Sequence, residues 1–230
     1  MTRLPHALRI LRLRLLLPLL FGKADLRVVL RRLEPAAPGG GDPEALLALV
    51  ERLTRPVRLW RTACLWRALT GYSVLRAAGD DVRFVVGVRK GPAGDLLWHA
   101  WLERAGRPSL GAPPPHEGWR PAFAWPIEPG NLVPRAEDDV PGLHASEDAL
   151  LTELRDGTGV LLDLGTRFYF TLNRTGVVAW KLLAGGAHDA SAIAAGVAAR
   201  YPDVDPAAVR EDVEALLAEL RAEKLAVERP

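Results

Sequence analysis

The middle of the chain begins with a helical pattern of hydrophobic residues. Between residues 62 and 78 apolar side chains recur every three or four positions and share one helix face: Leu65, Leu69, Tyr72 and Leu75. Thr62 is a residue type that caps helix N-termini, and Gly79 is the type that ends helices in the left-handed conformation. The pattern therefore predicts a helix over residues 62–78.

The next stretches have the character of β-strands. Residues 82–88 are rich in valine, and residues 96–102 form a second mainly apolar run. Between them, residues 89–95 contain the turn sequence Gly-Pro-Ala-Gly. We therefore expect an antiparallel pair of strands with the preceding helix packed on it.

A second group of elements is predicted toward the C-terminus. Two apolar runs, 159–164 and 167–172, are separated by Gly165-Thr166 and predict two strands. Asn173, Asp189 and Asp205 each stand where a helix would begin, and Pro206 favours the first turn of the last helix. A short sheet followed by three helices indicates a winged-helix-like module.

Prolines divide the chain between these two groups. Nine of the 19 prolines fall between residues 108 and 141, a composition typical of a loop or linker. We therefore expect an α+β protein with four segments: a basic helical segment (1–45), a first domain (46–128), a Pro-rich linker (129–146) and a second domain (147–230).

Charge is distributed unevenly along the chain. Residues 1–35 carry eight basic and two acidic residues, whereas residues 146–230 carry nine basic and 14 acidic residues. A nucleic-acid-binding protein concentrates basic residues on a folded domain, so we exclude nucleic acid as a partner. The basic segment is expected to form amphipathic helices that pack on the rest of the chain or lie against a membrane surface or a partner. A signal peptide is the less favoured alternative, because residues 21–25 make a poor cleavage site. Its apolar run, residues 15–21, is too short to span a bilayer.

The cysteine and histidine counts restrict the chemistry. With Cys64 as its single cysteine the chain has no internal disulfide, and we expect a free thiol in the reducing cytoplasm. One cysteine and five dispersed histidines make no zinc-ligand pattern, and Gly39-Gly40-Gly41 lacks the Lys-Ser/Thr of a phosphate loop. We expect neither a metal nor a cofactor.

Cys64 and His99 are the candidate catalytic residues. Cys64 stands in the first turn of the predicted helix, where unpaired amides and the helix dipole favour a thiolate. His99 lies on the return strand and can face the start of that helix. A thiolate beside an imidazole can attack a carbonyl and protonate the leaving amine. The alternative interpretation is a small buried cysteine and a histidine that packs among tryptophans.

The residues around this pair resemble a known family. The segments Cys64-Leu65-Trp66-Arg67-Ala68-Leu69 and His99-Ala100-Trp101-Leu102-Glu103 are similar to the leader peptidases of lasso-peptide biosynthesis, which are transglutaminase-like, papain-related cysteine hydrolases. The resemblance covers roughly residues 45–115. It implies a Cys–His–Asp triad in which Cys64 is the nucleophile and His99 the general base and acid.

One position departs from that family. The aspartate of the triad would stand about a dozen residues after the histidine, where this chain has Gly111. Because the third residue orients the imidazole, its loss is expected to slow turnover. Three possibilities stay open: a Cys–His dyad, a substitute carboxylate from Glu117 or Asp95, and an impaired enzyme. Glu103 is too far along a regular strand from His99 to serve.

The strand after residue 166 is the candidate peptide-binding element. Its backbone could accept a peptide as an additional strand, although its aromatic residues could equally form the core. Residues 150–225 resemble PqqD-like domains, which bind the leaders of ribosomally made, modified peptides. That resemblance implies a leader lying along this strand and beside the last helix, with the following contact residues: Arg167, Phe168, Tyr169, Phe170, Thr171, Val209, Val213 and Leu216.

Together the two resemblances predict one pathway. The leading hypothesis is a leader peptidase that captures a precursor leader and hydrolyses the leader–core bond through Cys64, with a lasso cyclase as a partner. The second hypothesis is a non-catalytic leader-binding adaptor on a degenerate peptidase scaffold, motivated by Gly111. Acyl transfer to an amine ranks last, because no residue marks an amine site.

Overall fold

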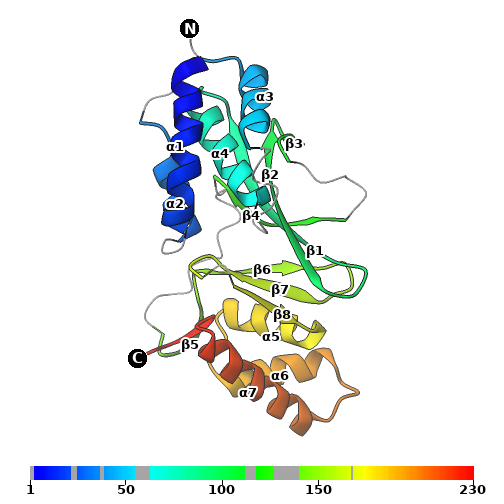
Figure 1. Cartoon of the computed structure of the whole chain (residues 1–230). Coiled ribbons are helices and arrows are strands. Elements are labelled where there is room, and N and C mark those ends of the chain that lie inside the picture. Colours follow the sequence, from blue (N-terminus) through cyan, green and yellow to red (C-terminus); the bar gives the residue numbers. More distant parts are fainter. Residues whose placement is uncertain are drawn as a thin grey trace. The chain divides into compact units, whose positions relative to one another are not determined.

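The computed structural model describes residues 3–21, 25–36, 39–54, 63–111, 118–126, 140–166 and 168–230. The chain divides into two compact units, Met1–Glu128 and Pro129–Pro230. Figure 1 labels their helices and strands. Among the described residues, the first unit has four helices and a four-stranded sheet, and the second has two small sheets and three helices, so the expected α+β class is confirmed.

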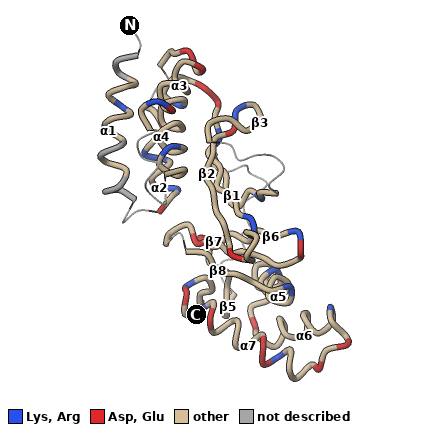
Figure 2. The backbone as a smooth tube through the Cα atoms, turned by 45° about the vertical axis from the view of Figure 1, so that its right-hand side comes forward, with Lys and Arg blue, Asp and Glu red and all other residues tan. Residues whose placement is uncertain are grey.

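The helices of the first unit surround a central one. α1 (Arg3–Phe21), α2 (Leu26–Leu33) and α3 (Pro43–Thr54) all contact α4 (Ala63–Ala77), most of whose residues are buried. Figure 2 marks the arginines that α2 and α4 carry. Ile10 and Leu17 of α1 are buried, which is the packing expected of the basic N-terminal segment. Among the described residues, no helix combines the length and hydrophobicity that a membrane crossing requires.

Polar contacts fasten α2 to α4. The Tyr72 hydroxyl donates a hydrogen bond to the Glu34 carboxylate, which also pairs with the Arg76 guanidinium at 3.1 Å. Burial acts to raise the pKa of Glu34, but the Tyr72 and Arg76 contacts outweigh it and hold the pKa below its usual range. A carboxylate ionised at neutral pH therefore joins the end of α2 to the buried helix.

The sheet of the first unit lies against α4. Its order is β3-β2-β1-β4, with β1 (Val82–Lys90), β2 (Leu96–Arg104), β3 (Arg107–Pro108) and β4 (Arg120–Trp125), and all its pairs are antiparallel. Phe84 packs edge-on against Tyr72 of α4, with ring centroids 6.5 Å apart. The helix and hairpin predicted from the sequence are confirmed, although Thr62 lies outside the described residues.

The described part of the second unit contains the predicted strands and helices and three further short strands. β6 (Ala149–Glu153), β7 (Gly159–Asp163) and β8 (Tyr169–Leu172) form an antiparallel sheet with β7 in the middle. β5 (Gly142–Ala145) pairs with β9 (Ala226–Arg229) in a second sheet. Residues 142–145, the end of the expected linker, are thus a strand, because their backbone pairs with the last strand of the unit.

Each helix of the second unit begins at its predicted cap. α5 (Arg174–Ala184), α6 (Ala190–Arg200) and α7 (Pro206–Ala222) start after Asn173, Asp189 and Asp205. Each cap side chain accepts a hydrogen bond from a backbone amide of the first turn, which satisfies a donor that the helix itself leaves unpaired. The local sequence therefore sets where these helices begin.

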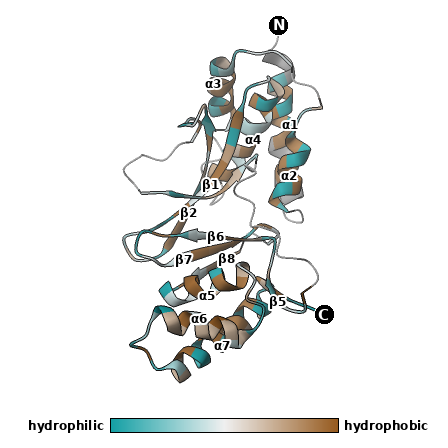
Figure 3. Cartoon of the chain, turned by 180° about the vertical axis from the view of Figure 1, so that it is seen from behind, coloured by the Kyte–Doolittle hydropathy of each residue, from teal (hydrophilic) through white to brown (hydrophobic). Residues whose placement is uncertain are grey.

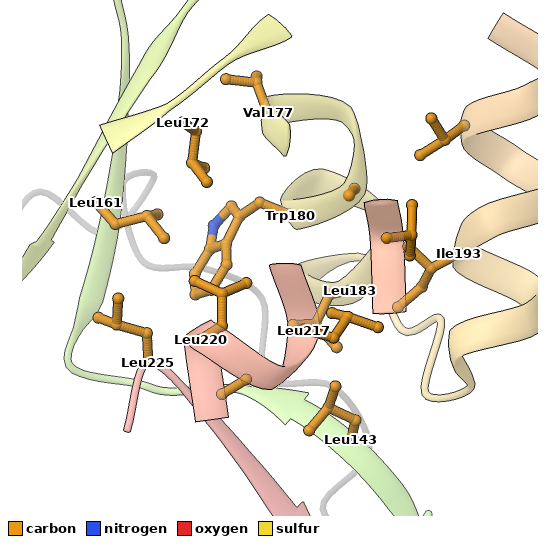
Figure 4. Close-up of a cluster of buried hydrophobic side chains, with 14 of the residues drawn as sticks. Leu143, Leu161, Leu172, Val177, Trp180, Leu183, Ile193, Leu217, Leu220 and Leu225 are labelled. Atoms are coloured by element: carbon orange, nitrogen blue, oxygen red, sulfur yellow. The ribbon is translucent and has the colours of Figure 1, made fainter. Parts of the chain in front are cut away.

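An apolar core joins the helices of the second unit to its sheets. Trp180 of α5 lies among Leu161, Leu172 and Leu220, which come from β7, β8 and α7 (Figure 4). β7 is buried along its whole length and is strongly hydrophobic in Figure 3. This core supports β8 from one side and leaves it at the edge of the sheet.

Candidate functional site

Cys64 lies in the first turn of α4, as predicted. It is the second residue of the helix, and its side chain is half-buried. Amides of the first helical turn have no carbonyl partner within the helix, and the positive end of the helix dipole is located there. This position favours the thiolate over the thiol.

His99 of β2 is hydrogen-bonded to the Cys64 thiol. The ring is half-buried and lies between two tryptophans, with centroid distances of 6.3 Å to Trp101 and 5.5 Å to Trp119. The backbone amide of Ala100 also donates a hydrogen bond to the Cys64 sulfur. The structure thus brings together the two residues that the sequence placed 35 positions apart.

These contacts shift both pKa values in the direction that nucleophilic catalysis requires. Burial acts to raise the pKa of Cys64, but the hydrogen bonds from His99 and the Ala100 amide, with the imidazolium charge, lower it below its ordinary value. The hydrogen bond to Cys64 raises the pKa of His99, against the opposing effects of burial and the Arg67 charge. Both directions favour a thiolate–imidazolium pair over a neutral pair.

The second ring nitrogen of His99 meets the backbone at Gly111. His99 Nε2 is 2.6 Å from the Gly111 carbonyl oxygen. Among the described residues, the groups hydrogen-bonded to His99 are therefore the thiol and this carbonyl, and neither is a carboxylate. The position expected to hold an aspartate supplies a main-chain oxygen instead.

The alternative carboxylates lie elsewhere or outside the description. Asp95 is exposed in the β1–β2 turn, with its carboxylate folded against Gly91. Glu103 accepts a hydrogen bond from the Trp101 indole at 3.1 Å. Glu117 lies outside the described residues. In this structure Asp95 does not replace the expected aspartate, because the strand carries it away from the ring.

Two further residues shape the surroundings of His99. Arg67 is three residues after Cys64 on α4, and its guanidinium lies within 3.2 Å of where a β-carbon at Gly111 would stand. Arg89 stacks its guanidinium on Trp119, 5.1 Å from the ring centroid. The sequence could have predicted that Arg67 lies near the site, because residues three positions apart share a helix face. It could not have predicted that Arg89 stacks on Trp119, because that contact depends on strand register.

The structure places the predicted leader-binding residues in two environments. In and next to β8, Phe168 is half-exposed at 50%, Thr171 is exposed, and Tyr169 and Phe170 are half-buried; Arg167 lies outside the described residues. The only strand that pairs with β8 within the described chain is β7. The opposite edge of β8 is therefore the part of the predicted surface that a peptide backbone could join.

Two of the predicted contact residues on α7 belong to the core instead. Val209 and Val213 are 5% and 4% exposed and pack in the cluster around Trp180. The helical face that suggested a groove is thus filled by the domain's own side chains in this structure, and the contact of these two residues with a leader stays a prediction. Leu216 is only partly buried, and the exposed residues of α7 include both acidic and basic ones, which Figure 2 colours along the helix.

No metal-ligand cluster accompanies the site within the part of the chain that the structure describes. Groups of three or more His, Cys, Asp or Glu side chains able to hold an ion are absent from those residues. The chemistry available at the described site is that of a thiol, an imidazole and backbone amides.

Two family models match this chain. The model of the transglutaminase-like superfamily matches residues 7–124, which include Cys64 and His99. The model described as coenzyme PQQ synthesis protein D (PqqD) matches residues 158–226, which include β7, β8 and the three helices that follow. No curated protein and no solved structure shows a significant match.

Proposed function

This chain belongs to the transglutaminase-like superfamily and carries a PqqD domain in its second unit, and from this pairing we propose that it is a leader peptidase in the biosynthesis of a ribosomally made, modified peptide of the lasso class. The observation that carries the proposal is the hydrogen-bonded pair formed by Cys64, at the start of α4, and His99 of β2. A reducing cytoplasm would keep Cys64 as a thiol.

The proposed reaction proceeds in two steps. The Cys64 thiolate attacks the carbonyl carbon of the leader–core bond, the C–N bond breaks, and the His99 imidazolium gives its proton to the departing amine of the core peptide. Water then attacks the thioester while His99 accepts its proton, releasing the leader carboxylate and the thiol. We assign oxyanion stabilisation to backbone amides of the first turn of α4.

The PqqD domain would supply the precursor. Such domains bind the precursor peptides of ribosomally made, modified peptides, and β8 stands at the edge of its sheet, with β7 as its strand partner among the described residues. Backbone pairing along that edge gives affinity that depends little on side chains. Holding the leader in the same molecule raises its effective concentration at Cys64. A lasso cyclase would then close the released core.

A second candidate function has one observation in its favour. His99 is oriented by a neutral carbonyl where a carboxylate was expected, so a non-catalytic leader-binding adaptor on a peptidase scaffold is the alternative. The adaptor would bind a leader and leave it intact at every pH. The two functions thus differ in whether Cys64 ever becomes acylated.

The deciding experiment incubates the full-length protein with a precursor encoded beside its gene and follows the products by mass spectrometry. The peptidase predicts cleavage by the wild type and none by Cys64→Ala, with a thioester adduct on Cys64 trapped at acidic pH. The control is His188→Gln, a histidine in the second unit. Equal cleavage by wild type and Cys64→Ala would refute the peptidase, and leader binding without cleavage would establish the adaptor.

A further inference from the structure

The contact between His99 and Gly111 fixes which ring nitrogen carries the proton. His99 Nε2 lies 2.6 Å from the Gly111 carbonyl oxygen, and a carbonyl can only accept a hydrogen bond. Nε2 must therefore be protonated whether the ring is neutral or charged. The lone pair of the neutral ring is then on Nδ1, the nitrogen left for the thiol. A general base needs this tautomer, because it must accept the thiol proton.

The backbone around Gly111 is held where this contact requires it. After β3 the chain continues along β2, with Ser109 N–H donating to Leu102 O at 2.7 Å and Leu102 N–H donating to Leu110 O at 3.0 Å. Leu110 is buried against α4 in the space left by Gly71, where a β-carbon would be 2.5 Å from the leucine side chain. The main chain immediately before Gly111 is therefore held in place by β2 and α4.

The β-carbon position at residue 111 lies against Arg67. Gly111 has a φ of +70°, and a β-carbon there would lie 3.2 Å from the Arg67 guanidinium. A carboxylate built on that carbon would meet the arginine rather than the imidazole. The Gly111 carbonyl therefore contacts His99, whereas a side chain at residue 111 would contact Arg67. An aspartate at this position would not simply add a carboxylate beside the imidazole.

We propose that Gly111 is the positioning residue of this site, and that its main-chain carbonyl holds His99 in the Nδ1-acceptor tautomer in place of a carboxylate. The inference rests on the proposed function for its catalytic meaning, but the geometry it describes does not depend on any substrate. It makes the adaptor explanation unnecessary, because the orienting role of the third group is filled. It also predicts that restoring an acid at residue 111 does not restore a better enzyme.

The first test reads the tautomer directly. In the ¹⁵N-labelled full chain with Cys64→Ala, at a pH where the His99 ring is neutral, long-range ¹H–¹⁵N spectra distinguish the two ring nitrogens. The His99 signals are identified by their loss in a His99→Gln variant. The expected result is a proton on Nε2 and an unprotonated Nδ1. A proton on Nδ1, or an averaged mixture of both tautomers, would overturn the proposal.

The second test asks whether an acid at residue 111 helps. Gly111→Asp is expected to lower the rate of Cys64 alkylation at neutral pH by about tenfold or more, since the new side chain pairs with Arg67 and strains the backbone that holds His99. Gly106→Asp is the matched control: its φ is +71°, no atom lies within 4 Å of its β-carbon position, and its alkylation rate should equal that of the wild type. Circular dichroism of both variants checks that each of them folds.

The outcomes separate this inference from the proposed function. A Gly111→Asp rate that equals or exceeds the wild-type rate would refute the positioning role. The predicted tautomer with no precursor cleavage would leave the positioning role standing and refute the peptidase. Precursor cleavage together with a proton on Nδ1 would support the peptidase and refute the positioning role of Gly111.

Discussion

At the scale of single residues, the reactivity of Cys64 depends on its hydrogen-bond partners. Burial alone would raise the pKa of the Cys64 thiol and make it less reactive. The hydrogen bonds from His99 and the Ala100 amide outweigh burial and lower that pKa overall. A lowered thiol pKa means that the thiolate persists at a lower pH than in a free cysteine. The sign of the shift therefore makes a prediction about reactivity that needs no substrate.

His99→Gln should make Cys64 behave like an ordinary thiol. Without the imidazole the thiol pKa rises, and at pH values below it each pKa unit lowers the thiolate fraction by about tenfold. Iodoacetamide alkylation, followed by intact mass across a pH series, should therefore begin at a higher pH in the variant than in the wild type. His188→Gln should match the wild type; identical profiles for wild type and His99→Gln would show that the pair is not coupled.

At the scale of elements, a glycine in β1 decides how Trp101 lies beside His99. Gly87 is opposite His99 in the β1–β2 register, and a β-carbon there would be 2.4 Å from the Trp101 indole and 3.0 Å from the Arg120 carbonyl oxygen. The indole therefore occupies the space that any other residue would need. The hairpin shapes the wall of the site as well as carrying the histidine.

Gly87→Ala should destabilise the first unit and disturb the site together. Overpacking of this kind costs about 1–3 kcal/mol of unfolding free energy. Chemical denaturation monitored by tryptophan fluorescence measures that loss, and Cys64 alkylation reports on the site. Gly40→Ala is the control, because no atom lies within 4 Å of its β-carbon position. Unchanged stability in Gly87→Ala would contradict the close packing of Trp101.

The register of β8 determines which of its backbone groups face a peptide. Asp163 N–H donates to Phe168 O at 3.0 Å, so in an antiparallel ladder Thr171 turns its amide and carbonyl away from β7. A leader that joins this edge would pair with Thr171. Phe168 and Phe170 then contribute through their side chains.

Thr171→Pro should weaken leader binding without breaking the β7–β8 ladder. Proline removes an outward amide, and proline is tolerated on edge strands. Loss of one paired donor predicts at least about tenfold weaker binding of a fluorescent leader peptide, measured by anisotropy. Thr171→Ala keeps the amide and should bind like the wild type. Equal affinities for both variants would place the leader elsewhere.

At the scale of the whole molecule, the two units divide the proposed work between capture and cleavage. Cys64 and His99 lie in the first unit, and the β8 edge lies in the second. The covalent link between the two units increases the efficiency of cleavage only if the second unit holds the leader while the first unit cleaves the precursor. This dependence can be measured by separating the units after folding.

Cutting the chain between the units should lower the efficiency of cleavage at low precursor concentration. A protease site introduced between residues 129 and 139 allows the folded protein to be severed. We expect kcat/KM for precursor cleavage to fall by about 100-fold once the units separate, while Cys64 alkylation stays unchanged. The same insertion left uncut is the control. An unaltered kcat/KM after separation by gel filtration would show that leader capture does not assist Cys64.

The sequence by itself determined the local elements of this protein. The apolar spacing in 62–78, the valine-rich strand and the caps at Asn173, Asp189 and Asp205 each specify a structure through contacts between near neighbours. They also located Cys64 at a helix start and His99 on a hairpin strand, positions from which the two side chains can meet. The sequence suffices for these elements because contacts between residues close in the chain determine where helices and strands form.

The tertiary structure decided what the side chains and the backbone of distant segments meet. The α7 face at Val209 and Val213 had the same pattern for a groove as for a core, and burial against Trp180 resolved it. Likewise, Gly111 offered no side chain to interpret, and only the hydrogen bonds of the preceding Ser109 and Leu110 with Leu102 of β2 place its carbonyl beside His99. A main-chain oxygen is common to every residue, so only the fold can give it a particular partner.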